Sequence, residues 1–176
     1  LRLEASVQEQ VRKQYSLLMQ QRENPGVPPI DLSNSYGEMG KLLMAAEHFD
    51  AAEPYYLNAQ TLAPGEMRWP YYLGHLYRKK GALAESEASF KRALELRPDD
   101  VAALLWLGEV YLADGRPEAA EPPFERALSL QPRSVSARFG LGRAALAKKD
   151  YRGAVKHLEE ALALDRQAVS IHYPLA

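Results

Sequence analysis

Small and bulky apolar side chains recur along this chain at a fixed step of 34 residues. The recurring positions are a glycine (Gly40, Gly74, Gly108, Gly142), a small residue (Ala52, Ser86, Ala120, Ala154), a bulky residue (Tyr56, Phe90, Phe124, Leu158) and an alanine (Ala59, Ala93, Ala127, Ala161). Pro64, Pro98 and Pro132 follow the same step, and Arg166 breaks that series. Self-similarity at a period of this size indicates a repeat architecture.

Within each period the pattern predicts two antiparallel helices. The residues around each glycine begin a first helix, and the glycine is expected to let a partner backbone come close. A turn follows, for which Asp50, Gly81, Gly115 and Asp150 supply conformational freedom and capping groups. The second helix carries the bulky residue between two small ones and ends at the proline, which cannot continue a helix.

The stretch before the repeats predicts one more amphipathic helix, over residues 1–21. Leu3, Val7, Val11, Tyr15 and Leu18 are spaced by three or four residues and are expected to share one face. A loop rich in proline and glycine follows at residues 22–31. We expect this helix to cover the first repeat, because the end of a repeat array exposes an apolar face.

With glycine, alanine, aromatic residues, leucine and proline at these offsets, the chain resembles the tetratricopeptide repeat family over most of its length. The resemblance implies an all-α fold, a right-handed α-solenoid of helix-turn-helix repeats with an N-terminal amphipathic helix. One continuous solenoid domain is expected. Its predicted parts are 1–31 (N-terminal helix and loop, acting as a cap), 33–66, 67–100, 101–134 and 135–168 (four repeats), and 169–176 (start of a truncated fifth repeat).

Two places depart from the pattern of the family. Pro70 stands where the family usually has tryptophan, but Trp69 is adjacent and a proline is tolerated in the first turn of a helix. Pro122 and Pro123 lie inside a second helix, where a kink or a late helix start is expected.

In the family that this chain resembles, one side of each first helix lines a concave groove. Carried over position by position, the groove positions here are Lys41, Arg68, Tyr71, His75, Arg78, Lys79, Leu105, Glu109, Phe139 and Arg143. They are cationic in the first two repeats and apolar in the last two. Such a surface suits a protein or peptide with an acidic part and an apolar part. The alternative is that the cations form an ordinary solvated face.

The overall charge excludes some classes of partner. The chain has 22 basic and 23 acidic side chains and a net charge of −1, so no global field attracts nucleic acid or an anionic membrane. Its apolar runs are shorter than the roughly 20 residues that a membrane helix needs, so no membrane insertion is expected. The absence of cysteine excludes disulfides and thiolate metal sites, and it leaves a cytoplasmic or periplasmic location equally open.

No enzymatic motif emerges. The stretch GLGRAA at 140–145 matches the glycine pattern of a dinucleotide-binding turn, but it falls inside a predicted helix with no strand before it. His48, His75, His157 and His172 lack the spacing of metal ligands, so neither a metal nor another cofactor is predicted. No nucleophile with a nearby base emerges either, so we expect a protein that is not an enzyme.

The leading hypothesis is therefore a non-catalytic scaffold that binds a peptide or partner segment in its groove. One alternative is the repeat arm of a larger enzyme, such as a glycosyltransferase, or of an assembly or secretion factor, whose chemistry lies outside these residues. Another is self-association through the open C-terminal repeat, because a repeat array without a cap leaves its last helix pair uncovered.

Overall fold

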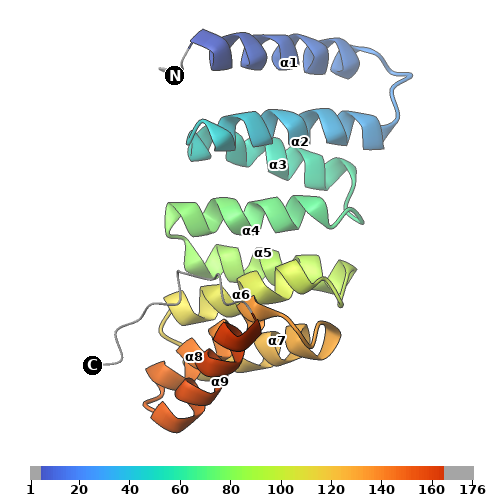
Figure 1. Ribbon diagram of the computed structural model, residues 1–176. Coiled ribbons are helices and arrows are strands. Elements are labelled where there is room, and N and C mark those ends of the chain that lie inside the picture. Colours follow the sequence, from blue (N-terminus) through green and yellow to red (C-terminus); the bar gives the residue numbers. More distant parts are fainter. Residues whose placement is uncertain (1–4, 165–176) are drawn as a thin grey trace. The chain divides into compact units, whose positions relative to one another are not determined.

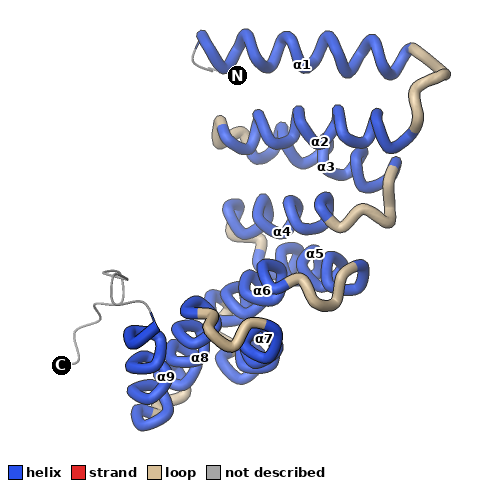
Figure 2. Tube along the Cα trace, turned by 45° about the vertical axis from the view of Figure 1, so that its right-hand side comes forward, coloured by secondary structure: helices blue, strands red, loops and turns tan. Residues whose placement is uncertain are grey.

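The computed structural model describes residues 5–164, and this part of the chain consists of nine α-helices without a strand. Figure 1 gives the order of the helices, and Figure 2 shows that only loops connect them. The predicted all-α class is confirmed. The predicted start of a fifth repeat at 169–176, together with Arg166, lies outside the described residues. The chain divides into two compact units after Arg97.

The first unit holds α1 (Ala5–Glu23), α2 (Pro29–Ala45), α3 (Phe49–Leu62), α4 (Arg68–Lys80) and α5 (Leu83–Leu96). Each of these helices packs against the next one in sequence up to the pair α4 and α5, with α1 lying on α2 (Figure 1). The core is built around Tyr56 and Trp69, both fully buried, with Met39, Leu43 and Leu73 packed beside them.

The second unit holds α6 (Val101–Ala113), α7 (Pro117–Leu130), α8 (Val135–Ala147) and α9 (Tyr151–Leu164). Here too each helix packs against the next, and α6 also contacts α8. Within this unit α6 and α8 therefore lie side by side, as equivalent helices of two successive repeats.

Each glycine of the 34-residue series leaves space that a bulky side chain fills, and we call this contact a glycine seat. A methyl group placed at Gly40, Gly74, Gly108 or Gly142 would lie 2.7, 2.8, 2.6 or 2.8 Å from the nearest atom of Tyr56, Phe90, Phe124 or Leu158. The expectation that the glycine admits a partner backbone was therefore wrong, because a side chain fills that space. The bulky residue comes from the second helix of the same repeat, so each seat holds one helix pair together.

All four turns between paired helices share one backbone geometry. Glu47, Gly81, Gly115 and Lys149 adopt the left-handed conformation, with φ of 59°, 76°, 70° and 65°. At the second of these turns Gly81 N–H donates to the Arg78 carbonyl at 3.1 Å and Ala82 N–H donates to the Tyr77 carbonyl at 2.9 Å. The same two bonds close the other three turns. This is the Schellman arrangement at a helix C-terminus.

The sequence had assigned the turn role in two of these repeats to the aspartates. Asp150 does cap α9, since its Oδ1 accepts from Gly153 N–H at 3.0 Å. Asp50, however, lies inside α3, and Glu47 takes the left-handed conformation instead. The tertiary packing of the helix pair imposes this conformation even where the residue is not glycine.

The two prolines of α7 do not delay its start. The helix begins at Pro117 and runs to Leu130 with Pro122 and Pro123 inside it, so the expected late start was wrong. Their two missing N–H groups leave the carbonyls of Glu118 and Ala119, in the first turn of α7, without a helical partner. Pro70 likewise lies in the first turn of α4, as expected.

The N-terminal helix packs on α2 through most of the predicted face, since Val7 and Val11 are partly buried and, among the described members of that face, Tyr15 alone is largely exposed; Leu3 lies outside the described residues. Tyr15 is 48% exposed, whereas Leu18 is buried. Successive steps of four residues turn about 40° past a full revolution, so Tyr15 drifts away from the face that carries Leu18. Gln14 and Gln21 take its place, since Gln14 Nε2 donates to the Ser35 carbonyl at 3.1 Å and Ser35 Oγ donates to Gln21 Oε1.

The helix bounds differ from the sequence boundaries around this junction. The loop between α1 and α2 is confined to residues 24–28, and α2 begins at Pro29, which lies before the predicted start of the first repeat at Ser33. Proline at the first helical position carries a preset φ and lacks an N–H that would have no partner there, which explains the early start.

The glycine seats differ in how much an added methyl group would cost. Phe90 is fully buried, so Gly74→Ala should lower the free energy of unfolding by about 2 kcal/mol, despite a gain of roughly 1 kcal/mol in helix propensity. Leu158 is only half-buried and can rotate away, so Gly142→Ala should be close to neutral. Urea unfolding of both variants tests this order, and equal costs would show that the ring is not what requires glycine.

The turn glycines allow a test of backbone conformation alone. A Cβ at Gly81 would meet no atom within 4 Å, so Gly81→Ala should cost about 1 kcal/mol purely because of its positive φ. The matched variant at the equivalent position, Lys149→Gly, should leave the free energy of unfolding unchanged or raise it. Thermal and urea unfolding measure both, and a neutral Gly81→Ala would contradict the assignment.

Candidate functional site

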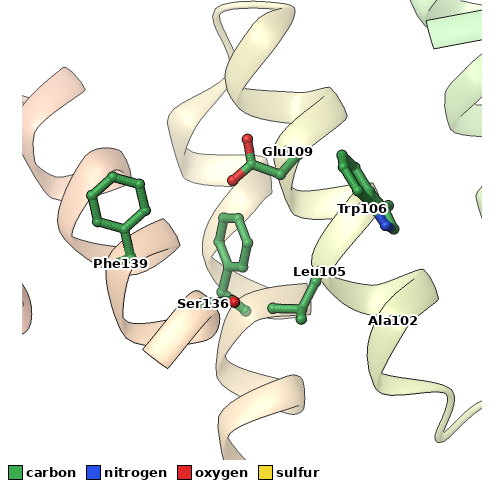
Figure 3. Close-up of a pocket in the computed structure, with 7 residues that line it drawn as sticks. Ala102, Leu105, Trp106, Glu109, Ser136 and Phe139 are labelled. Carbon is green, nitrogen blue, oxygen red and sulfur yellow. The ribbon is translucent and has the colours of Figure 1, made fainter. Parts of the chain in front are cut away.

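The groove positions of the second unit surround one apolar hollow (Figure 3). Its lining consists of Ala102, Leu105, Trp106 and Glu109 from α6, Phe124 from α7, and Ser136 and Phe139 from α8. Its volume is about 390 Å³, at the lower end of the range of small-molecule pockets, roughly 300–1,000 Å³. In Figure 3, Phe139 stands on one side of the hollow and Leu105 and Trp106 on the other.

Matching N-terminal caps bring α6 and α8 into the same register. Asp100 Oδ1 accepts from Ala103 N–H at 2.9 Å at the start of α6, and Ser134 Oγ accepts from Ala137 N–H at 3.2 Å at the start of α8. Aspartate and serine are favoured at this position because they satisfy an N–H that the helix leaves unpaired. Since the two caps are 34 residues apart, each groove position of α6 has its counterpart on α8.

The two charged groove positions of this unit form an ion pair with each other. Arg143 Nη1 donates to both carboxylate oxygens of Glu109, at 2.7 and 2.6 Å. The Arg143 guanidinium also lies 5.8 Å from the centroid of the Phe139 ring. The pair therefore spans from α6 to α8 and leaves this edge of the hollow polar but electrically neutral.

Phe124 forms the floor of the hollow, and its packing accounts for a glycine of the GLGRAA stretch at 140–145. Phe124 is fully buried, and methyl groups at Gly108 and Gly140 would lie 2.6 and 2.4 Å from its ring. Gly140 and Gly142 lie inside α8, so the stretch belongs to a helix, and its glycines seat Phe124 and Leu158. This placement lacks the strand and turn that a dinucleotide site needs.

Sequence reasoning missed Trp106 and Phe124 as lining residues. Trp106, Tyr72 and Gly140 occupy the same position in successive repeats, directly after a groove position. Where an aromatic residue of one repeat has glycine at the equivalent position of the next repeat, the absent side chain leaves space beside the aromatic ring. The pair Trp106 and Gly140 shows this pattern, which could have identified Trp106 as a lining residue. Phe124 belongs to the bulky core series, and only the structure shows that its ring also reaches the hollow.

Two cations among the groove positions of the first unit are held by carboxylates of the same unit. Lys41 Nζ lies 2.7 Å from Glu38 Oε1, and this hydrogen bond raises the pKa of Lys41. Arg68 Nη2 donates to Asn34 Oδ1 at 2.9 Å and to Glu66 Oε2 at 3.0 Å, which lowers the pKa of Glu66. These side chains are partly neutralised without any ligand.

The cationic run at the end of α4 divides into different roles. Lys80 lies 2.7 Å from both Asp50 and Glu53, so it ties the end of α4 to the start of α3. Lys79 is exposed and forms no ion pair within residues 5–164, whereas Arg78 is half-buried. Of this run, Lys79 has the charge most accessible to a partner.

Tyr71 and His75 pack against the core side of α5. The His75 ring lies 4.7 Å from the centroid of Tyr71 and 5.2 Å from that of Phe90, both edge-on. Burial, with a smaller contribution from the charge of Arg78, lowers the pKa of His75 to about 4. His75 is therefore a neutral ring at physiological pH and contributes shape rather than charge.

Two further features are relevant to function. Within residues 5–164, no group of histidine, aspartate or glutamate side chains is arranged to hold a metal ion. No helix of this described part is long and apolar enough to cross a membrane.

The lowered pKa of His75 predicts a pH-dependent stability. The folded state disfavours the protonated ring, so its contribution is complete above pH 6.5 and is lost as the pH falls toward 4. Between these values the free energy of unfolding should fall by about 1–2 kcal/mol more in the wild type than in His75→Gln. Urea unfolding at both pH values checks this. Equal losses would show that the ring is not desolvated.

Comparison with known proteins supports the repeat assignment. The family model of the tetratricopeptide repeat matches residues 38–100, 73–133 and 107–169. No curated protein matches the sequence significantly.

Several solved structures share the fold. A crystal structure of MamA is 21% identical, with a TM-score of 0.79, over 89% of this chain and 86% of that one. MamA residues 41 to the end from Desulfovibrio magneticus are 20% identical, with a TM-score of 0.74, over 93% of each chain. A tetratricopeptide repeat protein from Parabacteroides merdae is 16% identical, with a TM-score of 0.79, over 96% of this chain and 70% of that one. Because the family model matches most of the chain, this protein belongs to the tetratricopeptide repeat family.

Proposed function

We propose that this chain is a non-catalytic scaffold that binds a segment of a partner protein at its groove positions. Tetratricopeptide repeats are a scaffold fold typical of protein–protein interaction. The proposal adds the place of binding and its chemistry, with the apolar hollow of the second unit as the anchor site.

The observation that carries the proposal is the incompletely buried apolar lining of this hollow. Leu105, Trp106 and Phe139 are only partly buried, although side chains of this kind gain about 1.5–3 kcal/mol from complete burial. Aromatic residues in a concave site are also the commonest energetic anchors of protein interfaces. A partner side chain that fills the hollow would bury all three at once.

The cations of the first unit support a secondary acidic contact. Lys79 is exposed and forms no ion pair among the described residues. It can therefore bind a carboxylate of the partner without first breaking an ion pair within the chain. Exposed ion pairs contribute only about 0–1 kcal/mol, so such contacts would orient the partner more than hold it.

A second candidate interaction face lies on α9. Tyr151, Val155 and Leu162 are 63%, 39% and 48% exposed and follow one another at offsets of four and seven residues, which places them on one side of the helix. This face favours the alternative of self-association through the C-terminal repeat. Its variants therefore serve as the contrast in the experiment below.

A capture experiment distinguishes the two faces. Ser136→Arg fills the rim of the hollow from an exposed position and should change the free energy of unfolding by no more than about 0.5 kcal/mol. It should abolish recovery of the partner from a lysate of the source organism, and Phe139→Ser should do the same. Leu162→Ser, an apolar-to-polar change on α9, should leave recovery intact, and the double variant Arg78→Glu with Lys79→Glu should weaken it.

Thermal unfolding of each variant provides the control for folding. If Ser136→Arg and Phe139→Ser both fold and still retain the wild-type partner, or if the wild type captures nothing, the hollow is not the binding site. If Leu162→Ser alone loses a protein, or changes the mass of the chain in sedimentation, the α9 face is the interaction surface instead.

A further inference from the structure

The hollow continues into a longer strip with a regular arrangement. Along α6 the side chains of the strip are Leu105, Glu109 and Leu112, and along α8 they are Phe139, Arg143 and Leu146. We call these six residues the groove strip. Two apolar pairs, Leu105 with Phe139 and Leu112 with Leu146, therefore flank the Glu109–Arg143 ion pair. Leu146 is 43% exposed and Leu112 is half-buried, so the second apolar pair also remains accessible.

The spacing of the apolar pairs favours a helical occupant. On each helix they are seven residues apart, which corresponds to two turns or about 10.5 Å. A bound helix presents residues i and i+7 on one face at the same spacing. In an extended segment, side chains on one face are about 6.6 or 13 Å apart, so it cannot place two anchors on both apolar pairs.

The polarity of the strip favours the same occupant. Apart from the central ion pair, all its side chains are hydrocarbon. An extended segment lying on this surface would bury backbone N–H and C=O groups without partners, and each unsatisfied group costs about 1–3 kcal/mol. A helix satisfies its own backbone and presents only side chains.

The ion pair determines what the middle of that helix must carry. Arg143 contacts Glu109 through Nη1 only, so its Nε and Nη2 edge has no hydrogen-bond partner within residues 5–164. The carboxylate accepts one bond at each oxygen and can accept more. The two side chains are 33% and 31% exposed, so the pair keeps free donor and acceptor capacity that a bound segment can use, with no net charge.

An amide side chain is the complement of such a pair. Its carbonyl accepts from the guanidinium and its NH₂ donates to the carboxylate, and it introduces no charge. A carboxylate would accept a hydrogen bond from Arg143 but would be repelled by the like charge of Glu109. A lysine would donate to Glu109 but would be repelled by the like charge of Arg143. A leucine would cover the pair and leave its free polar edges unsatisfied.

The geometry points to an amphipathic helix of a partner protein as the occupant of the groove strip. This helix carries two large apolar residues seven positions apart and a glutamine or asparagine three or four positions after the first. The inference rests on the proposed function, since it names the class of segment that the same site takes.

Synthetic helices test the inference with the full chain. The probes are capped peptides of about 18 residues, because isolated helices shorter than about 12–15 residues are marginal in water. One carries leucine at i and i+7 with glutamine at i+3, and three others replace that glutamine by glutamate, lysine or leucine. A fifth probe keeps the two leucines and the glutamine but separates them with prolines, so that it stays extended. Binding is followed by the fluorescence of Trp106, which lines the hollow, with Trp106→Phe as the control for the signal.

The glutamine helix should bind most tightly. Replacement by glutamate or lysine should weaken binding about tenfold, because one hydrogen bond to a charged group is lost, and replacement by leucine should weaken it further, because both are lost. Ser136→Arg should abolish its binding, and raising the salt concentration should have little effect, since no net charge is paired. Binding that is equal for all four helices, or tighter for the glutamate or lysine helix, overturns the amide assignment.

The failure of the inference can be distinguished from the failure of the proposed function. If the extended probe binds best and Ser136→Arg abolishes this binding, the hollow is an anchor site but its occupant is not a helix. If no probe changes the emission of Trp106 while a partner captured from the lysate is lost in Ser136→Arg, the helical inference falls and the proposed function stands. If that partner is also retained by Ser136→Arg, both are wrong.

Discussion

The contact between a glycine of one helix and a bulky side chain of the next is the interaction on which the rest of this structure depends. Tyr56, Phe90, Phe124 and Leu158 each lie where a methyl group on the opposite glycine would be closer than 3 Å. A seat of this kind sets how near the two helices of a repeat approach and how they are rotated. Because the seat recurs every 34 residues, the helix pairs are alike, and within each unit equivalent side chains of its pairs lie next to each other, as Asn34 does with Arg68 and Glu109 with Arg143.

The candidate site follows from this regularity. Once α6 and α8 share a register, residues 34 apart become neighbours, so Glu109 meets Arg143 and Leu105 lies across the hollow from Phe139. Phe124 belongs to both roles, since its ring joins α7 to α6 and also forms the floor of the hollow. In this repeat, packing and recognition are therefore not separable.

Electrostatics contributes less to this surface than its residue types suggest. Lys41, Arg68 and Arg143 each have a carboxylate within 3 Å, and desolvation keeps His75 neutral. An incoming acidic group must compete with these internal partners, so the net gain from such contacts is small. The apolar hollow carries no equivalent cost, because its lining only exchanges water for another hydrocarbon surface. This difference is why we place the anchor of the proposed partner in the second unit.

The sequence alone was sufficient to predict the all-α class and the 34-residue period. Both depend on side-chain size at regular spacing, and the same pattern occurs in each repeat. The resemblance to the repeat family also predicted that Leu105, Glu109 and Phe139 share one surface, and all three line the hollow. The sequence could not show that Arg143 neutralises Glu109, that Tyr15 remains 48% exposed or that Glu47 takes a left-handed conformation. Those outcomes depend on distances between helices, which arise only when packing fixes the angle and separation of each pair.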